Sequence, residues 1–160
     1  MAQTTPSIGQ QILALWQRLS PWPGGRYLFG LILNKAVPYT GTIKPAVCEL
    51  RPGFARIEMA DRRRVRNHLN SVHAIALLNL GEAATGLALL TGMPPGVRGI
   101  ITGLSMEYFK KARGRLSAGC TATLPSVKGD VEHEVIAEIT DKAGDVVARC
   151  TAKWRLGLIP

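Results

Sequence analysis

The sequence predicts an α+β fold in which a curved antiparallel sheet of five to six strands wraps around one apolar helix. Residues 74–92 form a long run with a single charge, and short apolar or alternating segments flank this run on both sides. A helix this apolar must be shielded from water, and a sheet can cover it. A chain of 160 residues that is 46% hydrophobic supplies enough core for one such domain.

The first 40 residues are predicted to be a helical extension that packs on a single domain formed by residues 41–160. In residues 7–20, Ser7 and Gln10 form a capping box and the apolar side chains fall on one helical face, so a helix is expected there. Residues 27–37 are short and apolar, and periodicity fits a helix or a strand. We favour a short helix.

Six segments are predicted to be strands. Residues 42–50 and 54–60 flank the turn Arg51-Pro52-Gly53 and are expected to pair. Four further segments, 98–109, 115–124, 131–140 and 146–154, alternate with period two and are expected to follow one another as an antiparallel meander. In the first of these, one face is predicted to carry Ile100, Thr102, Leu104, Met106 and Tyr108.

The central run, AIALLNLGEAATGLALLTG, contains Glu82 as its one charge. A membrane span is disfavoured, because this carboxylate and several polar or small residues make insertion into lipid costly. Two interpretations of Glu82 stay open. It is a rim residue that is hydrogen-bonded or paired with an arginine, or it is a buried carboxylate whose raised pKa makes it a general base.

The helix is expected to begin near residue 74, with Ser71 or His73 as its cap, and its first N–H groups, those of Ala74 and Ile75, can bind an oxyanion. His73 and Glu82 lie nine residues apart, which separates them by ~13 Å and about half a turn on a helix. One chain cannot bring both to one carbonyl group. If both act, a two-fold dimer must join Glu82 of one subunit to the helix start of the other.

Residues 67–82 resemble a known protein family. Asn67, His73, Ala76, Leu77 and Glu82 resemble the Asn, His-Gly-Gly, Leu and Asp/Glu pattern of hotdog-fold acyl-CoA thioesterases of the phenylacetate-pathway type. The segment MEYFKKARGRLSA, residues 106–118, is similar to a strand-turn-strand of the same superfamily. The segment RRRVRNHLNSVHA resembles an uncharacterised, thioesterase-like branch.

The resemblance implies a hotdog fold and a role for each matching residue. Glu82 would be the base or nucleophile that attacks the thioester, and Asn67 would position water or the carboxylate. The N–H groups of Ala74 and Ile75 would polarise the thioester carbonyl, and His73 would orient the start of the helix. The family usually has glycines where this chain has Ala74 and Ile75, so the approach to the helix is expected to be narrower.

The formal charge of +9 favours a polyanionic partner. Two basic clusters hold 8 of the 20 Lys and Arg residues: Arg62, Arg63, Arg64, Arg66; and Lys110, Lys111, Arg113, Arg115. Each cluster alone is also compatible with a solvated face. Coenzyme A needs such charge for its phosphates, and Lys110, Lys111, Arg113, Arg115, Arg64 and Arg66 are the predicted contacts. Nucleic acid is disfavoured, because no recognised module accompanies the charge.

The remaining signals are weaker. The three cysteines are widely spaced and fit core positions rather than a disulfide or zinc framework, and no metal or other cofactor is expected apart from coenzyme A as part of the substrate. The N-terminal residues carry no secretion signal, which favours a cytoplasmic location. The sequence therefore predicts an acyl-CoA thioesterase acting as a homodimer or dimer of dimers, or alternatively a non-catalytic acyl-CoA or lipid-binding hotdog module.

Overall fold

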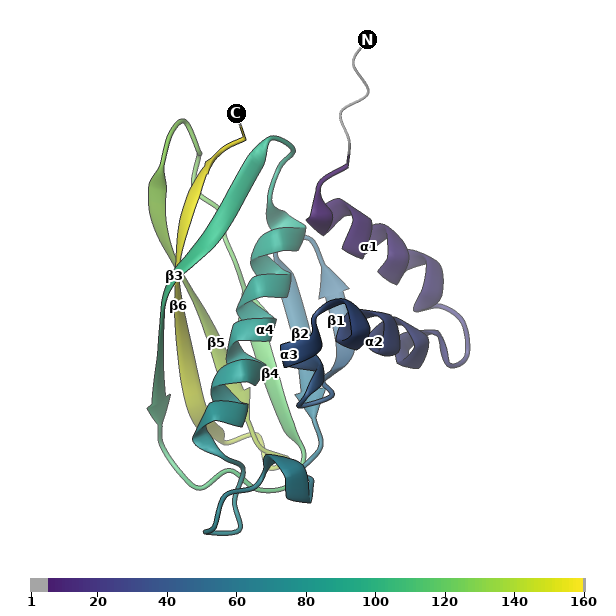
Figure 1. Cartoon of the computed structure of the whole chain (residues 1–160), viewed down its shortest axis with the longest axis vertical. Helices are drawn as coiled ribbons and strands as arrows, with labels where there is room; N and C mark the ends of the chain where they lie inside the picture. The colour runs from purple at the N-terminus through teal and green to yellow at the C-terminus, as the bar shows by residue number, and fades with distance from the viewer. Residues whose placement is uncertain (1–5, 160) are drawn as a thin grey trace.

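A six-stranded antiparallel sheet curves around the long helix α4, and three N-terminal helices lie beside this helix (Figure 1). The structure is a computed structural model that describes residues 6–159, so residues 1–5 of the predicted extension and Pro160 lie outside it. The elements are α1 Ile8–Leu19, α2 Gly25–Ala36, α3 Pro38–Gly41, β1 Ala46–Arg51, β2 Phe54–Met59, a 3₁₀ turn Arg63–Val65, α4 Ala74–Gly92, β3 Val97–Tyr108, β4 Leu116–Thr121, β5 Val131–Thr140 and β6 Val146–Leu158.

The strand order is β1-β2-β4-β5-β6-β3, and this corrects the predicted meander of the last four strands. β4, β5 and β6 are consecutive neighbours, but β3 pairs with β6 along its whole length, from Val97 opposite Leu158 to Tyr108 opposite Ala148. β4 is half as long as β3 and pairs with β2 instead. Alternation along one strand shows its two faces and does not show its neighbour.

A β-bulge between Ile101 and Gly103 corrects the predicted face of β3. The extra residue reverses the alternation, because two residues of one strand then oppose one of the other. Ile100 therefore lies opposite Arg155 on the outer face, whereas Leu104 lies opposite Ala152 on the side of α4. The hydroxyl of Thr102 also turns outward, to Glu132.

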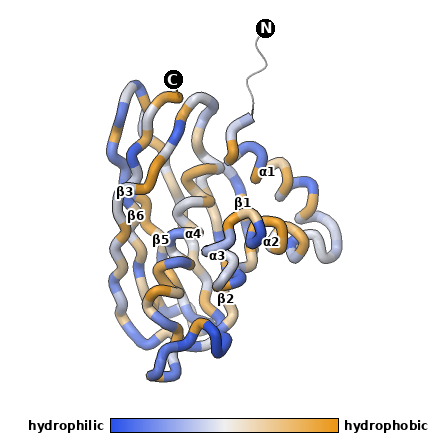
Figure 2. Tube along the Cα trace, viewed as in Figure 1, coloured by the Kyte–Doolittle hydropathy of each residue, from blue (hydrophilic) through white to orange (hydrophobic). Residues whose placement is uncertain are grey.

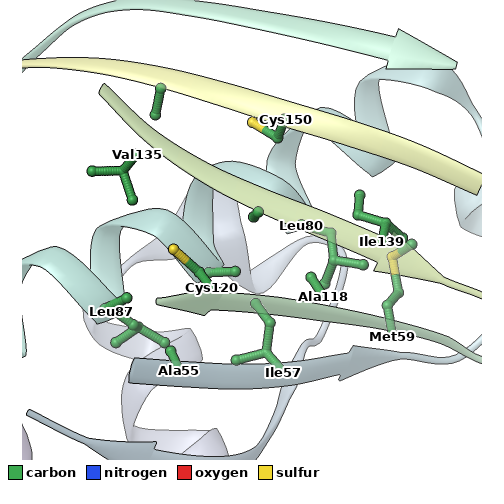
Figure 3. Packing of buried hydrophobic residues seen from close by; sticks show 14 of the residues in the cluster. Ala55, Ile57, Met59, Leu80, Leu87, Ala118, Cys120, Val135, Ile139 and Cys150 are labelled. Carbon is green, nitrogen blue, oxygen red and sulfur yellow. The ribbon is translucent and has the colours of Figure 1, made fainter. Parts of the chain in front are cut away.

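α4 supplies the centre of the core. Leu80, Ala84 and Ala88 are fully buried. Figure 3 shows Leu80 among inward side chains of the sheet such as Ala118 and Ile139. A Cβ atom at Gly81 would collide with the side chain of Cys150, so this glycine allows α4 to lie directly on β6. α4 is long and apolar enough to cross a membrane, yet 67% of its most apolar window is buried within the fold.

The N-terminal helices cover the part of α4 that the sheet leaves open. α1 begins with the predicted capping box of Ser7 and Gln10, and α2 is the short helix favoured by the sequence. A Cβ atom at Gly9 would collide with the backbone at Leu90, which shows that α1 and α4 touch closely. Trp16 of α1 and Phe29 of α2 are buried and pack edge to face, 5.1 Å between ring centroids.

Candidate active site

Glu82 lies in the third turn of α4. Its carboxylate is partly buried and, within residues 6–159, accepts no hydrogen bond and forms no ion pair. Burial raises the pKa of this carboxyl group above its ordinary value. The rim arrangement with a hydrogen-bond or arginine partner for the carboxylate, which the sequence left open, is absent from the described part of the chain. A desolvated carboxylate without a partner is a suitable proton acceptor.

Two hollows meet at Glu82. The first, here called the apolar cavity, has a volume of about 120 Å³ and lies under the N-terminal helices. Its lining residues are Ile12, Leu33, Val37, Thr40, Pro45, Val47, Ile57, Glu82, Ala83, Gly86, Leu87 and Leu90. The second, here called the edge groove, has a volume of about 300 Å³ and opens toward β3. Its lining residues are Tyr39, Ile75, Leu78, Asn79, Glu82, Ile101 and Leu104.

His73 is the N-cap of α4. Its Nδ1 atom accepts a hydrogen bond from the Ile75 N–H at 3.1 Å, as N-cap side chains do with the second or third residue of a helix. The Ile75 N–H thus already donates a hydrogen bond within the chain. This corrects the prediction that the N–H groups of Ala74 and Ile75 are both free to bind an oxyanion. Of that pair, only the Ala74 N–H has no hydrogen-bond partner among the described residues.

Asn67 shapes the loop before α4. Its Oδ1 atom accepts hydrogen bonds from the Leu69 N–H at 2.9 Å, the Ser71 N–H at 3.2 Å and the Ser71 hydroxyl at 3.1 Å. The side-chain oxygen is therefore committed to the loop, and only the amide NH₂ group remains for a ligand. Asn67 lines a hollow of about 250 Å³ with Ala74 and Lys111, and Glu82 of the same chain does not line that hollow.

Three of the six predicted coenzyme A contacts are held by carboxylates. Lys110 Nζ lies 2.6 Å from both Asp141 and Asp145, at the β5–β6 turn. Arg66 pairs with Asp61 at 2.6 Å, and Arg115 pairs with Glu58 at 3.1 Å. The hydrogen bond from Lys110 holds the pKa of Asp141 below its usual range. Carboxylates already neutralise these cations, so they are expected to bind a phosphate less strongly than unpaired cations would.

The other three predicted contacts keep more of their charge available. Lys111 and Arg64 form no ion pair within residues 6–159, and Arg113 donates only to the Asn70 carbonyl oxygen, at 3.3 Å. Lys111 lines the hollow that contains Asn67 and Ala74. Arg64 lines another hollow, of about 200 Å³, with His73 and Ile75. Unneutralised charge thus lies on both sides of the start of α4.

Sequence reasoning missed two polar residues beside the site. Asn79 lies three residues before Glu82 in the edge groove, and its amide donates to the Tyr39 carbonyl oxygen at 3.2 Å, which joins α4 to α3. Tyr108 donates its hydroxyl to the Ala74 carbonyl oxygen at 3.1 Å, and burial raises the pKa of this phenol. The helical spacing of Asn79 and Glu82 was a readable signal, because such residues are neighbours on one face. Tyr108 gave no local signal.

The chain is similar in fold to several proteins of known structure. No curated protein matches the sequence. A structural-genomics protein, APC5556, is 28% identical, with a TM-score of 0.81 over 96% of this chain and 100% of its own. A probable thioesterase of unknown function from Pseudomonas aeruginosa is 21% identical, with a TM-score of 0.72 over 79% of this chain and 91% of its own. A mutant of the phenylacetic acid degradation protein PaaI from Thermus thermophilus is 22% identical, with a TM-score of 0.63 over 74% of this chain and 97% of its own.

These similarities establish the hotdog fold that the sequence predicts, with thioesterase-like neighbours. The sequence also matches the model of a family described as a domain of unknown function, DUF4442, over residues 25–156. The matched region begins within the predicted extension and includes α2 and α3. The chain therefore belongs to the DUF4442 family.

Proposed function

We propose that this protein is an acyl-CoA thioesterase in which Glu82 is the general base or nucleophile. The observation that carries the proposal is the unpaired, partly buried Glu82 carboxylate between the apolar cavity and the edge groove. A thioester substrate has an apolar acyl group on one side of its carbonyl carbon and a large polar group on the other. A carboxylate between an apolar hollow and an open one suits attack at that carbon.

The site requires two subunits in this proposal. Glu82 and the free Ala74 N–H of one chain line separate hollows. β3 ends the sheet and has no strand on its other side within residues 6–159, and Ile101 and Leu104 line the edge groove beside it. A partner subunit related by a two-fold axis next to β3 would cover this apolar edge, and the start of its α4 would then lie close to Glu82. The assembly is a homodimer or a dimer of dimers.

The two hollows suggest how the substrate is divided. A dry protein cavity of ~150 Å³ accepts benzene, so the apolar cavity of about 120 Å³ suits a short acyl chain or a phenyl group. The coenzyme A phosphates would meet the uncompensated cations Lys111 and Arg64 at the start of α4, with Arg113 nearby. Lys110, Arg66 and Arg115 would contribute less, because carboxylates already hold them.

The reaction follows from these positions. The Glu82 carboxylate takes a proton from water while the water oxygen attacks the thioester carbon. The carbonyl oxygen becomes an oxyanion that accepts a hydrogen bond from the Ala74 N–H of the partner subunit. The intermediate collapses, the C–S bond breaks and the departing sulfur takes the proton from Glu82. The products are a carboxylic acid and free coenzyme A, and Glu82 is again ionised.

A non-catalytic acyl-CoA or lipid-binding module is the second candidate. The Ile75 N–H is occupied by His73, and the Ile75 side chain is 51% exposed at the helix start, where it narrows the approach of a thioester. A site with a single N–H donor stabilises an oxyanion less than a site with two. Binding without turnover would fit that geometry.

Thiol release from a panel of acyl-CoA thioesters separates the two candidates. The enzyme predicts release by the wild type and a loss of about 10²- to 10⁴-fold in kcat for Glu82→Gln and Glu82→Ala. Glu134→Gln is the matched control, because Glu134 lies opposite Lys153 on the outer face and, among residues 6–159, forms an ion pair with Lys153 alone. Tight acyl-CoA binding without thiol release would favour the module. Turnover unaffected by Glu82→Gln would refute the proposed mechanism.

A further inference from the structure

The N-terminal helices present an apolar surface that the proposed thioesterase site does not use. Trp22, in the turn between α1 and α2, and four side chains of α2 are each between 41% and 73% exposed: Tyr27, Leu28, Leu31 and Ile32. At 100° per residue, the α2 members span roughly 140° of the helix, and Phe29 lies on the opposite, buried side. We call these five side chains the α2 surface. Figure 2 shows α2 as a mostly apolar segment at the outside of the molecule.

The charge around the α2 surface has one sign. Residues 1–48 contain no Asp or Glu, whereas Arg18, Arg26 and Lys35 lie in α1 and α2. Viewed down the axis of α2, Lys35 lies within the arc formed by the apolar side chains, at an angle between those of Leu31 and Leu28. Arg18 and Lys35 form no ion pair within the described residues 6–159, and Arg26 donates only to the Cys48 carbonyl oxygen. A surface with exposed Trp, Tyr and Leu among cations is typical of a helix that lies in a lipid headgroup region.

We propose that the α2 surface docks this protein on the surface of an anionic phospholipid bilayer. The apolar side chains would enter the boundary between headgroups and acyl chains, while Arg18, Arg26 and Lys35 would meet the lipid phosphates. A second copy of the chain fits this surface less well, because a two-fold contact would bring the cations of both copies together without any carboxylate from α1 or α2. The proposal is independent of the thioesterase proposal.

The α2 surface lies on the opposite side of α4 from the edge proposed for dimerisation. α2 contacts β1, and β1 and β3 are the two opposite ends of the sheet. In Figure 1, α1 and α2 lie on one side of α4 and β3 lies on the other. A dimer formed through β3 would therefore leave the α2 surface of each subunit free for a bilayer.

Co-sedimentation with vesicles tests the proposal on the full-length protein. The wild type is expected to bind vesicles of phosphatidylcholine mixed with phosphatidylglycerol at least about ten-fold more strongly than vesicles of phosphatidylcholine alone, and salt is expected to weaken the binding. Leu31→Glu is expected to weaken it by at least about ten-fold. Ile100→Glu is the matched control, because Ile100 is also a large exposed side chain, 64%, on the outer face of β3.

Several outcomes would overturn the proposal. One is a wild type that does not bind the anionic vesicles, and another is a Leu31→Glu variant that binds as well as Ile100→Glu. A third outcome comes from sedimentation equilibrium without lipid. If Leu31→Glu has a lower mass than both the wild type and Ile100→Glu, the α2 surface is a contact between copies of the chain. Hydrolysis of dissolved acyl-CoA is expected to be the same in both variants, so failure here is distinct from failure of the proposed enzyme.

Discussion

The imidazole of His73 accepts a hydrogen bond from the backbone N–H of Ile75 across 3.1 Å. This contact caps α4 and at the same time occupies a donor that the family resemblance assigns to the thioester carbonyl. In the proposed mechanism, the cap and an oxyanion would therefore compete for one N–H group. Stability of α4 and strength of the proposed oxyanion site would then be opposed at this position.

Replacement of His73 tests the cap. His73→Ala is expected to lower the free energy of unfolding by about 0.5–2 kcal/mol, because the Ile75 N–H loses its acceptor. His73→Ser restores a side-chain oxygen at the N-cap and is expected to recover most of that loss. Urea unfolding of both variants gives the measurement. Equal losses for the two variants would show that the imidazole stabilises the protein in some other way.

The raised pKa of Glu82 predicts how pH affects activity and stability. The base must be ionised, so kcat/KM should rise with pH through a pKa above the ordinary glutamate value. Between the ordinary carboxyl pKa and the raised folded pKa, the folded chain keeps a proton that the unfolded chain has lost. The free energy of unfolding contributed by Glu82 therefore falls as pH rises through this window.

Glu82→Gln removes that ionisation. The variant is expected to match the wild type in free energy of unfolding below the ordinary carboxyl pKa and to exceed it above the folded pKa. Chemical denaturation across pH gives both curves. If the two curves stay parallel at every pH, the Glu82 carboxyl group is not desolvated in the folded state.

The bulge in β3 provides a matched pair of variants that test the proposed dimer. Leu104 faces the edge groove and Ile100 faces outward on the same strand. Leu104→Glu is expected to produce monomers and to abolish thiol release, because a charge in an apolar subunit contact is costly. Ile100→Glu is expected to remain a dimer and to stay active. Sedimentation equilibrium distinguishes them, and a monomeric wild type would exclude a site shared between subunits.

The apolar cavity is predicted to set the acyl preference. Leu33→Ala enlarges the cavity and should shift kcat/KM toward longer acyl chains, whereas Ala83→Leu fills it and should shift the preference toward shorter ones. Leu15→Ala is the control, since Leu15 also packs on the core from an N-terminal helix and does not line the cavity. Both truncations are expected to cost ~2 kcal/mol. An unchanged preference in the two cavity variants would place the acyl chain elsewhere.

Two adjacent lysines are predicted to differ in their effect on coenzyme A. Lys111→Ala should raise KM for acyl-CoA about three- to ten-fold, because this cation has no ion-pair partner in residues 6–159 and lies near the start of α4. Lys110→Ala should leave KM nearly unchanged, because Lys110 is held by Asp141 and Asp145. Steady-state kinetics compares them. A larger KM effect for Lys110 would reverse the assignment.

The sequence by itself determined the elements and the position of the exceptional charge. The boundaries of α4 and the alternation of β5 and β6 are local signals, because helical period, strand period and caps extend over a few residues. The tertiary structure decided what these elements meet. In the folded chain β3 pairs with β6, and a bulge in β3 directs Leu104 into the groove that Glu82 lines. The Ile75 N–H donates a hydrogen bond to His73, and a cavity remains beneath α1 and α2. Strand neighbours, hydrogen-bond competition and unfilled volume depend on side chains distant in sequence, so no local pattern of residues specifies them.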